Sequence, residues 1–304
     1  MFYTGPMRAE YREENCRSAL NRVKGMPFAW SLNPYTGCVH RCTFCYVRAF
    51  ELRADRPADD RYGRSIRVKV NVAEVLAREL ARPSWRGEQI AIGAATDPYQ
   101  PAEGRYRLTR ACIEVLARAR SPFGLITRGP LIVRDVDVLQ EASRRAEVSV
   151  MFSVPTLDPV VWRTTEPGTA PPRQRLRALS TLVDAGIKAS VAMAPILPGL
   201  SDRPEQLAEV VKAVRAAGAT SVWANLLYLK PGTKEHFLEA LARDWPEELE
   251  RYEQLYAQRA YLPSAEVDPV RDRVRRLAHE HGVRDRRKQP LEPPPEPVQL
   301  TFAI

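Results

Sequence analysis

The sequence predicts an α/β fold in which one parallel sheet is built from six strand–helix units. From residue 72 to residue 227, amphipathic helical stretches alternate with short apolar stretches of strand character. Two of the helical stretches are closed by Gly186 and Gly218, the residue type that most easily adopts the left-handed conformation after a helix. Six units are too few for a closed eight-stranded barrel.

The expected elements follow one another in a regular order. Helices are expected at 43–53, 72–80, 108–119, 135–146, 173–185 and 205–217. Strands are expected just before residue 37 and at 89–95, 123–127, 148–154, 187–194 and 221–227. This alternation with short links implies right-handed crossovers, and functional groups then gather at the carboxyl ends of the strands.

The segments outside this alternating core, which spans 31–230, have a different composition. Residues 1–30 are basic and polar and are interpreted as an N-terminal arm. Residues 231–288 are interpreted as a helical cap over the open side of the sheet, with charged helices at 234–243, 247–260 and 268–281. Five aromatic residues are assigned to packing in this region: Trp223, Phe237, Trp245, Tyr252 and Tyr256. Residues 289–304 form a proline-rich linker and an apolar tail.

Charge and composition restrict the class of protein. The chain has 46 Lys and Arg against 37 Asp and Glu, a net charge of +9, which favours an anionic partner, nucleic acid first, over merely solvated charged faces. The stretch 271–288, with eight basic and three acidic residues, suits either a phosphate contact or a solvated helix face. The sequence has no long apolar run, so we expect no membrane segment. It shows no signal peptide and has an odd number of cysteines, so we expect a cytoplasmic protein.

Three of the five cysteines, Cys38, Cys42 and Cys45, form a C-x3-C-x2-C pattern. Three thiolates on one loop can bind three irons of a [4Fe–4S] cluster and leave the fourth iron open for an exchangeable ligand. Zinc is an alternative, with His40 completing a Cys3His set, although zinc sites usually space their ligand pairs farther apart. Cysteines without any metal are the third possibility.

Polar residues follow several of the predicted strands at the edge where functional groups are expected. They are Thr96 and Asp97 after the second strand, Arg128 after the third, and Ser153, Glu166 and Arg173 around and beyond the end of the fourth. One cation and small hydroxyl side chains at neighbouring strand ends can bind a carboxylate and sugar hydroxyls. Other chemically interesting residues are assigned to structure: His236, His279 and His281 to polar helix surfaces, and Cys112 to the apolar core.

The cysteine pattern, with the aromatic Phe44 directly before its third cysteine, resembles the signature of radical S-adenosylmethionine (SAM) enzymes. Those enzymes use a partial (β/α)6 barrel, so the resemblance implies this fold, here with C-terminal helices. It also implies a [4Fe–4S] cluster on Cys38, Cys42 and Cys45 that binds SAM at its open iron, with Phe44 lining the cofactor pocket. In that family one electron from the cluster, supplied by a donor such as flavodoxin or ferredoxin, cleaves SAM to methionine and a 5′-deoxyadenosyl radical.

Further motifs between about residues 30 and 230 resemble the spore photoproduct lyase-like branch, also called DNA repair photolyase-like proteins. The motifs are G-C-x3-C-x-F-C-Y, T-D-P-Y-Q-P-x-E, I-T-R, R-D-x-D-x-L, E-P and P-I-L-P-G. This resemblance implies SAM contacts at Thr96 and Ser153, a contact to the SAM carboxylate at Arg128 and a catalytic Tyr46. It also implies a nucleic acid as the substrate.

Two departures separate this chain from the lyase itself. The lyase has a hydrogen-donating cysteine where this chain has Ala94, and a second tyrosine where this chain has Phe44. A peptide- or RNA-modifying radical enzyme and a non-catalytic, metal-stabilised nucleic-acid-binding protein are therefore the alternatives. The tail 299–304 resembles peptides that dock on the bacterial sliding clamp, and an apolar end that folds back on the barrel is the alternative there.

Overall fold

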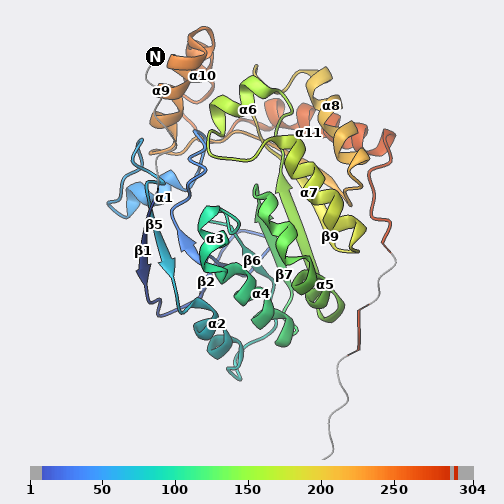
Figure 1. Ribbon diagram of the computed structural model, residues 1–304. Coiled ribbons are helices and arrows are strands. Elements are labelled where there is room, and N and C mark those ends of the chain that lie inside the picture. The colour runs from blue at the N-terminus through green and yellow to red at the C-terminus, as the bar shows by residue number, and fades with distance from the viewer. Residues whose placement is uncertain (1–8, 288–290, 294–304) are drawn as a thin grey trace, which may run out of the picture.

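The computed structural model describes residues 9–287 and 291–293, and its centre is a seven-stranded sheet (Figure 1). The strand order is β10-β9-β8-β7-β6-β3-β2. The strands are β2 Leu20–Arg22, β3 Trp30–Leu32, β6 Ile90–Ile92, β7 Phe123–Thr127, β8 Val148–Ser153, β9 Lys188–Ile196 and β10 Val222–Leu226. All neighbours from β3 to β10 are parallel, and β2 is antiparallel to β3 at the edge. The six parallel strands confirm the predicted fold class.

Five helices connect or flank these strands, and each of them begins and ends within two residues of its predicted position. They are α2 Val72–Leu80, α4 Leu108–Arg118, α5 Val136–Arg145, α7 Pro172–Asp184 and α8 Pro204–Ala216. In α2, the apolar residues Val72, Val75 and Leu76 recur every three or four positions and are buried, which is why this stretch forms a helix against the core. Helices α4, α5 and α7 lie on one side of the sheet (Figure 1). Two short helices, α3 Pro101–Tyr106 and α6 Pro159–Thr165, were not predicted.

The two faces of the sheet carry different side chains. Leu125 in β7 and its register partner Val150 in β8 are buried, on the face that α5 and α7 cover. Because strand residues alternate between faces, Gly124 and its partner Ser149 belong to the opposite face. We call this opposite face the second face, and it is defined by Gly124, Ile126, Ser149, Met151, Ser153, Ser190, Ala192 and Trp223.

Residues 10–22, expected to be an irregular arm, contain two strands. In a small separate sheet, β1 (Glu10–Glu14) pairs with β5 (Ser65–Lys69), which also pairs with β4 (Tyr35–Thr36). Strand β2 joins the main sheet, where the buried backbone N–H groups of Ala19 and Leu20 donate to the Glu79 carboxylate. The polar composition concealed these strands because their pairing is made by the backbone while charged side chains face outward.

The helix expected at 43–53 begins only at Arg48, as α1 (Arg48–Arg53). The residues before it form separate hydrogen-bonded turns: the Cys45 N–H donates to Cys42 O at 3.2 Å, and the Arg48 N–H donates to Cys45 O at 3.1 Å. A tighter, irregular path therefore replaces the first helical turns of the cysteine-containing segment.

The C-terminal helices lie in two places. Helices α9 (Lys234–Asp244) and α10 (Leu249–Leu255) stand beside α1, whereas α11 (Ser264–Glu280) packs against β10 and α8 (Figure 1). Phe237, Tyr252 and Tyr256 are buried, as predicted. The assignment of Trp223 to packing is wrong: its side chain is 43% exposed, because Trp223 belongs to the second face of β10 while its neighbour Ala224 points into the core.

Two findings concern the predicted partners. Among the helices that the structure describes, none is both long enough and apolar enough to cross a membrane. The predicted clamp-binding tail, 299–304, and most of the predicted linker lie outside the described residues.

Candidate metal and cofactor site

The cysteine loop, residues 37–45, follows β4 and precedes α1. Cys38 and Cys42 are buried and Cys45 is half-buried, and none of the five cysteines forms a disulfide. Burial raises the pKa of the Cys42 thiol well above its usual value; Arg128 opposes this rise, and the charges of Cys45 and Cys38 add to it. This mutual influence shows that the three sulfur atoms share one neighbourhood.

The arrangement of the loop fits a cluster better than a single ion. No three His, Cys, Asp or Glu side chains in the described part of the chain converge on one ion position. Zinc ligands must converge, because each lies about 2.0–2.3 Å from the metal. In a [4Fe–4S] cluster each cysteine binds a different iron, so the three sulfur atoms need not meet at one point.

His40, the predicted fourth zinc ligand, is engaged elsewhere. Its Nδ1 lies 3.3 Å from Asp97 Oδ2, and both side chains are buried. Burial lowers the pKa of His40, but the charges of Cys38 and Asp97 outweigh burial and raise it to about 10. The contact with Asp97 fixes the orientation of the His40 ring beside the cysteine loop.

Two side chains of the loop after β6 fix the backbone of the cysteine loop. Thr96 Oγ1 donates to Gly37 O at 2.6 Å, and Gln100 Nε2 donates to the same oxygen at 3.1 Å. Gln100 Oε1 accepts from the Val39 N–H at 3.2 Å. Thr96, predicted to contact SAM, therefore already uses its one hydroxyl proton within the protein.

Two glycines allow the cysteine loop to be enclosed closely. A Cβ atom at Gly63 would overlap the backbone oxygen of Cys38, and Gly63 has a φ of +76°. A Cβ atom at Gly168 would overlap the backbone oxygen of Val39. Two distant segments of the chain thus contact the loop backbone so closely that no side chain fits between them.

A buried cation without a carboxylate partner lies beside the cysteines. Arg48 is 1% exposed, and it donates from Nη1 to Ala58 O at 2.6 Å and to Asp59 O at 2.8 Å. Its Nε is buried without a hydrogen-bond partner among the described residues. Burial lowers the pKa of Arg48, while the nearby Cys45 charge opposes that effect. Because an unpaired buried charge costs several kcal/mol, this environment calls for an anion.

Tyr62 connects Arg48 to the third cysteine. Its hydroxyl oxygen lies 3.7 Å from Cys45 Sγ, and the Arg48 guanidinium lies 4.8 Å from the centre of its ring. A [4Fe–4S] cluster bound by three thiolates is net negative, so it provides the anion that Arg48 lacks and an acceptor for the Tyr62 hydroxyl. The donor set and its surroundings therefore fit a cluster.

Arg128 lies at the carboxyl end of β7, over the predicted cofactor-lining residue. Its guanidinium is 5.8 Å from the centre of the Phe44 ring. Arg128 Nε donates to Glu166 Oε1 at 2.6 Å, and the buried Arg175 donates to Glu166 Oε2 at 2.7 Å. Burial raises the pKa of Glu166, but Arg175 and Arg128 outweigh burial and lower it. Two cations on one carboxylate leave a net positive charge beside Phe44, which suits an anionic group of SAM.

Tyr46 and Ser153, the remaining predicted site residues, lie at the same edge of the sheet. The Tyr46 hydroxyl donates to Ala94 O, and its ring centre is 6.0 Å from that of Tyr228. Burial, with the charge of Cys45, raises the pKa of Tyr46 to about 12. Ser153 is buried at the end of β8, and its backbone oxygen accepts from Arg175 at 2.8 Å.

The structure brings the predicted site residues to one edge of the sheet, together with several supporting residues that the sequence analysis did not single out. The motif containing Thr96 also contained Gln100, whose role no pattern revealed. Arg173, noted with Glu166, is exposed and pairs with Glu209, whereas Arg175 two positions later is the buried partner of Glu166. Tyr62, Gly63 and Gly168 belong to no motif or ligand spacing from which a functional site could be predicted.

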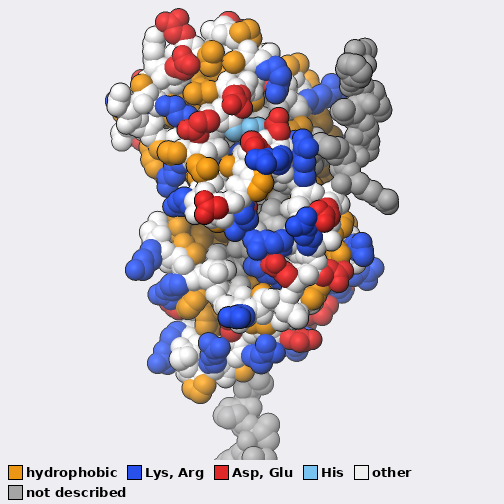
Figure 2. All heavy atoms as spheres, turned by 90° about the vertical axis from the view of Figure 1, so that its left-hand side faces the viewer, with side chains coloured by type: hydrophobic (Ala, Val, Ile, Leu, Met, Phe, Trp, Pro, Cys, Tyr) orange, Lys and Arg blue, Asp and Glu red, His pale blue; other side chains and the backbone are white. Residues whose placement is uncertain are grey.

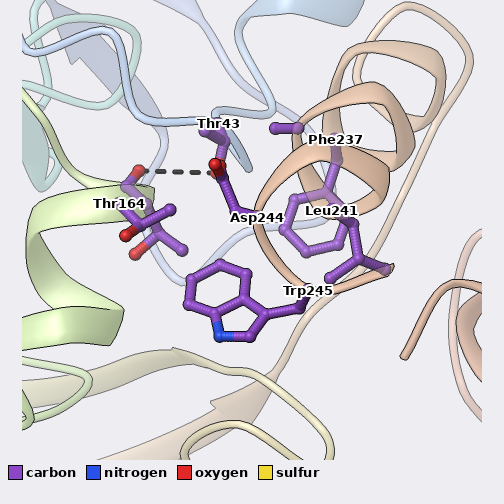
Figure 3. A pocket seen from close by; sticks show the side chains of 8 residues that line it. Thr43, Thr164, Phe237, Leu241, Asp244 and Trp245 are labelled. Carbon is purple, nitrogen blue, oxygen red and sulfur yellow. Dashed lines mark hydrogen bonds between the residues drawn. The ribbon is translucent and has the colours of Figure 1, made fainter. Parts of the chain in front are cut away.

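A small pocket between the cysteine loop and α9 is a packing contact. It is lined by Thr43, Thr164, Thr165, Phe237, Ala240, Leu241, Asp244 and Trp245 (Figure 3). Thr43 Oγ1 donates to Thr165 O at 3.5 Å across it, and there is no room for a water molecule.

On the molecular face shown in Figure 2, Lys and Arg side chains are interspersed with Asp and Glu.

Known proteins are similar to this chain in sequence and in fold. The model of the Radical SAM superfamily matches residues 32–211. An uncharacterized protein of Mycobacterium tuberculosis is 39% identical over 298 residues, covering 96% of this chain and 88% of that protein. An uncharacterized protein of Methanocaldococcus jannaschii is 24% identical over 237 residues, covering 77% of this chain and 83% of that protein. The solved structure of spore photoproduct lyase complexed with dinucleoside spore photoproduct has a TM-score of 0.69 at 16% identity, covering 89% of this chain and 79% of that chain.

A six-stranded parallel α/β sheet with three cysteines on a loop at its carboxyl edge defines an iron–sulfur enzyme architecture. The chain belongs to the radical SAM superfamily. It is therefore an enzyme that uses a [4Fe–4S] cluster and SAM, and enzymes of this family generally need a reductant.

Proposed function

We propose that this radical SAM enzyme abstracts a hydrogen atom from a nucleic acid, with its cluster bound by Cys38, Cys42 and Cys45. Arg48 carries the assignment of the cluster. Its buried guanidinium lies beside Cys45 and Cys42, and its Nε has no hydrogen-bond partner within the part of the chain that the structure describes. The cluster would neutralise this charge. Cys16 is hydrogen-bonded through its backbone to Asn71, and Cys112 is buried in α4, so the proposal gives neither a role at the cluster.

The residues around the cluster have separate roles in the proposal. When bound, the cluster supplies one electron that cleaves SAM to methionine and a 5′-deoxyadenosyl radical, which takes a hydrogen atom from the substrate. Arg128, oriented by Glu166, binds the SAM carboxylate, and Phe44 lines the adenine pocket. Ser153 contacts SAM, and Thr96, whose proton is already donated, accepts from a ribose hydroxyl.

Tyr46 is the proposed catalytic side chain. Its hydroxyl lies at the carboxyl end of β6, against Ala94 O, and it is held neutral by its raised pKa. A neutral phenol keeps an O–H group that can return a hydrogen atom to a substrate radical, and one electron from the proposed reductant with one proton then restores the tyrosyl radical to tyrosine. The Tyr46 ring is in turn positioned by Tyr228.

Two observations support a nucleic acid as the substrate. The chain carries a net charge of +9, and a solved structure with the same fold binds a dinucleoside. Since Ala94 stands where the lyase has its cysteine, the proposal extends to nucleic acids as a class, DNA repair included, and not to spore photoproduct repair itself.

Iron content and SAM cleavage test this proposal. After anaerobic reconstitution, the wild-type protein should be brown and contain about four irons per chain. With dithionite and SAM it should form 5′-deoxyadenosine. Cys38→Ala, Cys42→Ala and Cys45→Ala should each lose the cluster, whereas the matched control Cys16→Ser should keep it. A colourless wild-type protein that binds zinc, or cluster binding without any SAM cleavage, would contradict the proposal.

The proposal includes the setting of the reaction. The electron donor is a flavodoxin or ferredoxin, and the site is cytoplasmic, where unpaired cysteines stay reduced. Docking of residues 299–304 on a sliding clamp is also part of the proposal, and it concerns residues outside the described ones.

A further inference from the structure

An exposed tryptophan lies on the second face of the sheet, level with the proposed cofactor residues. In the strand register, Trp223 of β10 pairs with Ala192 of β9, and Ala192 pairs with Ser153 of β8. All three residues therefore share one face and one level along the strands. Two interstrand spacings of about 4.8 Å place Trp223 roughly 10 Å from Ser153. The residue between them in the register is Ala192, and both Ala192 and Ser153 are buried.

The indole is oriented by one contact and otherwise left open. Trp223 Nε1 lies 3.2 Å from Met151 Sδ, on the same face. Nevertheless, 43% of the side chain is exposed. A ring that is held at one edge and is bare over much of its surface can stack against another flat group.

A guanidinium is bound to the residue two positions after this indole in β10. Arg271 lies on the face of α11 that also carries the buried residues Val267 and Val274, so it points toward β10. Its Nη2 donates to Asn225 Oδ1 at 2.7 Å. Asn225 lies at a register irregularity in β10, between Ala224 and Leu226. Such irregularities re-aim side chains and are frequent beside active sites.

The charge of Arg271 remains available to an anion. Its nearest carboxylate, Asp268, is 3.9 Å away, and both side chains are about half exposed, so this ion pair is weak. Asn225 fixes the guanidinium through one N–H group. A phosphate could therefore bind the remaining N–H groups while a base stacks on Trp223.

We infer that Trp223 and Arg271 form a subsite for a single-stranded nucleic acid, in which one nucleobase stacks on Trp223 and an adjacent phosphate pairs with Arg271. The inference rests on the proposed function and deepens it, since it places the substrate across the second face with its reacting nucleotide near Ser153. A single strand is required because a base within a duplex has no free face to stack on the indole.

Fluorescence anisotropy would test the stacking part with labelled twelve-nucleotide dT and rU strands and a DNA duplex of equal length, on the reconstituted enzyme with SAM. Trp223→Leu is expected to weaken single-strand binding by about 5- to 150-fold, because it removes a stacking contact of about 1–3 kcal/mol. Trp223→Phe, which retains an aromatic ring, should keep affinity within about fivefold. The dT and rU arms decide whether the strand is DNA or RNA.

The chain offers a matched aromatic control. Tyr261 is another exposed aromatic residue, 57% exposed, stacked on Tyr228 and near Lys230. Tyr261→Leu should leave the affinity unchanged within about twofold. A loss with Tyr261→Leu but not with Trp223→Leu would overturn the inference, as would equal losses with Trp223→Phe and Trp223→Leu.

Salt dependence tests the phosphate part. Arg271→Ala should reduce the slope of log affinity against log salt by about 0.7, the value for one phosphate contact on a single strand. Arg78→Ala, which removes an exposed arginine on α2, should leave the slope unchanged. An unchanged slope with Arg271→Ala overturns the phosphate contact.

Failure of this subsite and failure of the proposed function are distinguishable. Suppose that the wild-type enzyme cleaves SAM. The subsite is then wrong, and the radical chemistry stands, if Trp223→Leu leaves strand binding unchanged, if the wild type binds no strand, or if the wild type prefers the duplex. If the wild-type enzyme does not cleave SAM, the proposed function is wrong whatever the binding data show. The midpoint of thermal unfolding of each Trp223 variant should match the wild type within a few degrees, which confirms that lost binding is not lost folding.

Discussion

The carboxyl ends of β6 and β7 and the part of β10 that lies level with the carboxyl end of β8 differ in how tightly their residues are held. After β6, the buried Asp97 carboxylate accepts from Tyr99 N, Thr127 Oγ1 and Arg128 N at 2.6–2.9 Å. On β10, Trp223 has one sulfur contact and is 43% exposed, and Asn225 lies where the register of β10 and β9 is irregular. One half of this edge is a closed hydrogen-bonded network and the other half is open.

The two halves of this edge meet two different requirements of one active site. A cluster and SAM must be held in a fixed geometry, and buried networks with every group paired provide that rigidity. A substrate must enter and leave, and its contacts are better placed on exposed side chains. We therefore expect substitutions at the closed half to reduce stability and cluster binding together, and substitutions at the open half to affect substrate binding alone.

The largest effect is expected from Glu166→Gln, at the centre of the closed half. This change leaves the guanidinium groups of the buried Arg175 and the half-buried Arg128 without their shared anion. Removing one partner from a buried ion pair costs about 3–5 kcal/mol. The midpoint of thermal unfolding should therefore fall by roughly 10 °C.

A surface carboxylate provides the control for that experiment. Glu209 pairs with the exposed Arg173, and an exposed pair contributes about 0–1 kcal/mol. Glu209→Gln should shift the midpoint by no more than about 2 °C. Equal shifts for the two variants would mean that burial of the Glu166 pair is not what stabilises the closed half.

A smaller effect is expected when the enclosure of the cysteine loop is disturbed. In Gly63→Ala, the new Cβ overlaps Cys38 O and the residue must also keep a φ of +76°. Gly25, with a φ of +75°, has open space around it, so Gly25→Ala measures the backbone strain alone, about 1–2 kcal/mol. Gly63→Ala should be less stable than Gly25→Ala by a further ~1–2 kcal/mol, as overpacking is, and should bind less iron after reconstitution. Full iron content in Gly63→Ala would show that the loop can shift without losing the cluster.

The sequence predicts features that depend on neighbouring residues and misses features that depend on contacts between distant segments. Strand β7 and helix α2 have the predicted bounds because periodicity is a local property of the chain. The cysteines were found because their ligand spacing is local too. The contacts of Gly63 and Gly168 with the loop join segments that are far apart in the sequence, and no local pattern encodes them. Arg175 and not Arg173 is the buried partner of Glu166 because the two positions lie on opposite sides of α7, and no local pattern distinguishes them. Trp223 was misassigned because the face of an edge strand depends on what packs against it.

The smallest effect on stability is expected at the open half. Trp223→Ala removes a large side chain that is 43% exposed and touches Met151 at its edge, so we expect a loss of about 1 kcal/mol or less. Phe152, in β8 and on the helix-covered face, is fully buried, and Phe152→Ala should cost about 3–5 kcal/mol. Thermal unfolding of the two variants compares equivalent truncations on opposite faces of one sheet. If Trp223→Ala were as destabilising as Phe152→Ala, the indole would be a core residue, and its exposure could not be explained by a role in binding substrate.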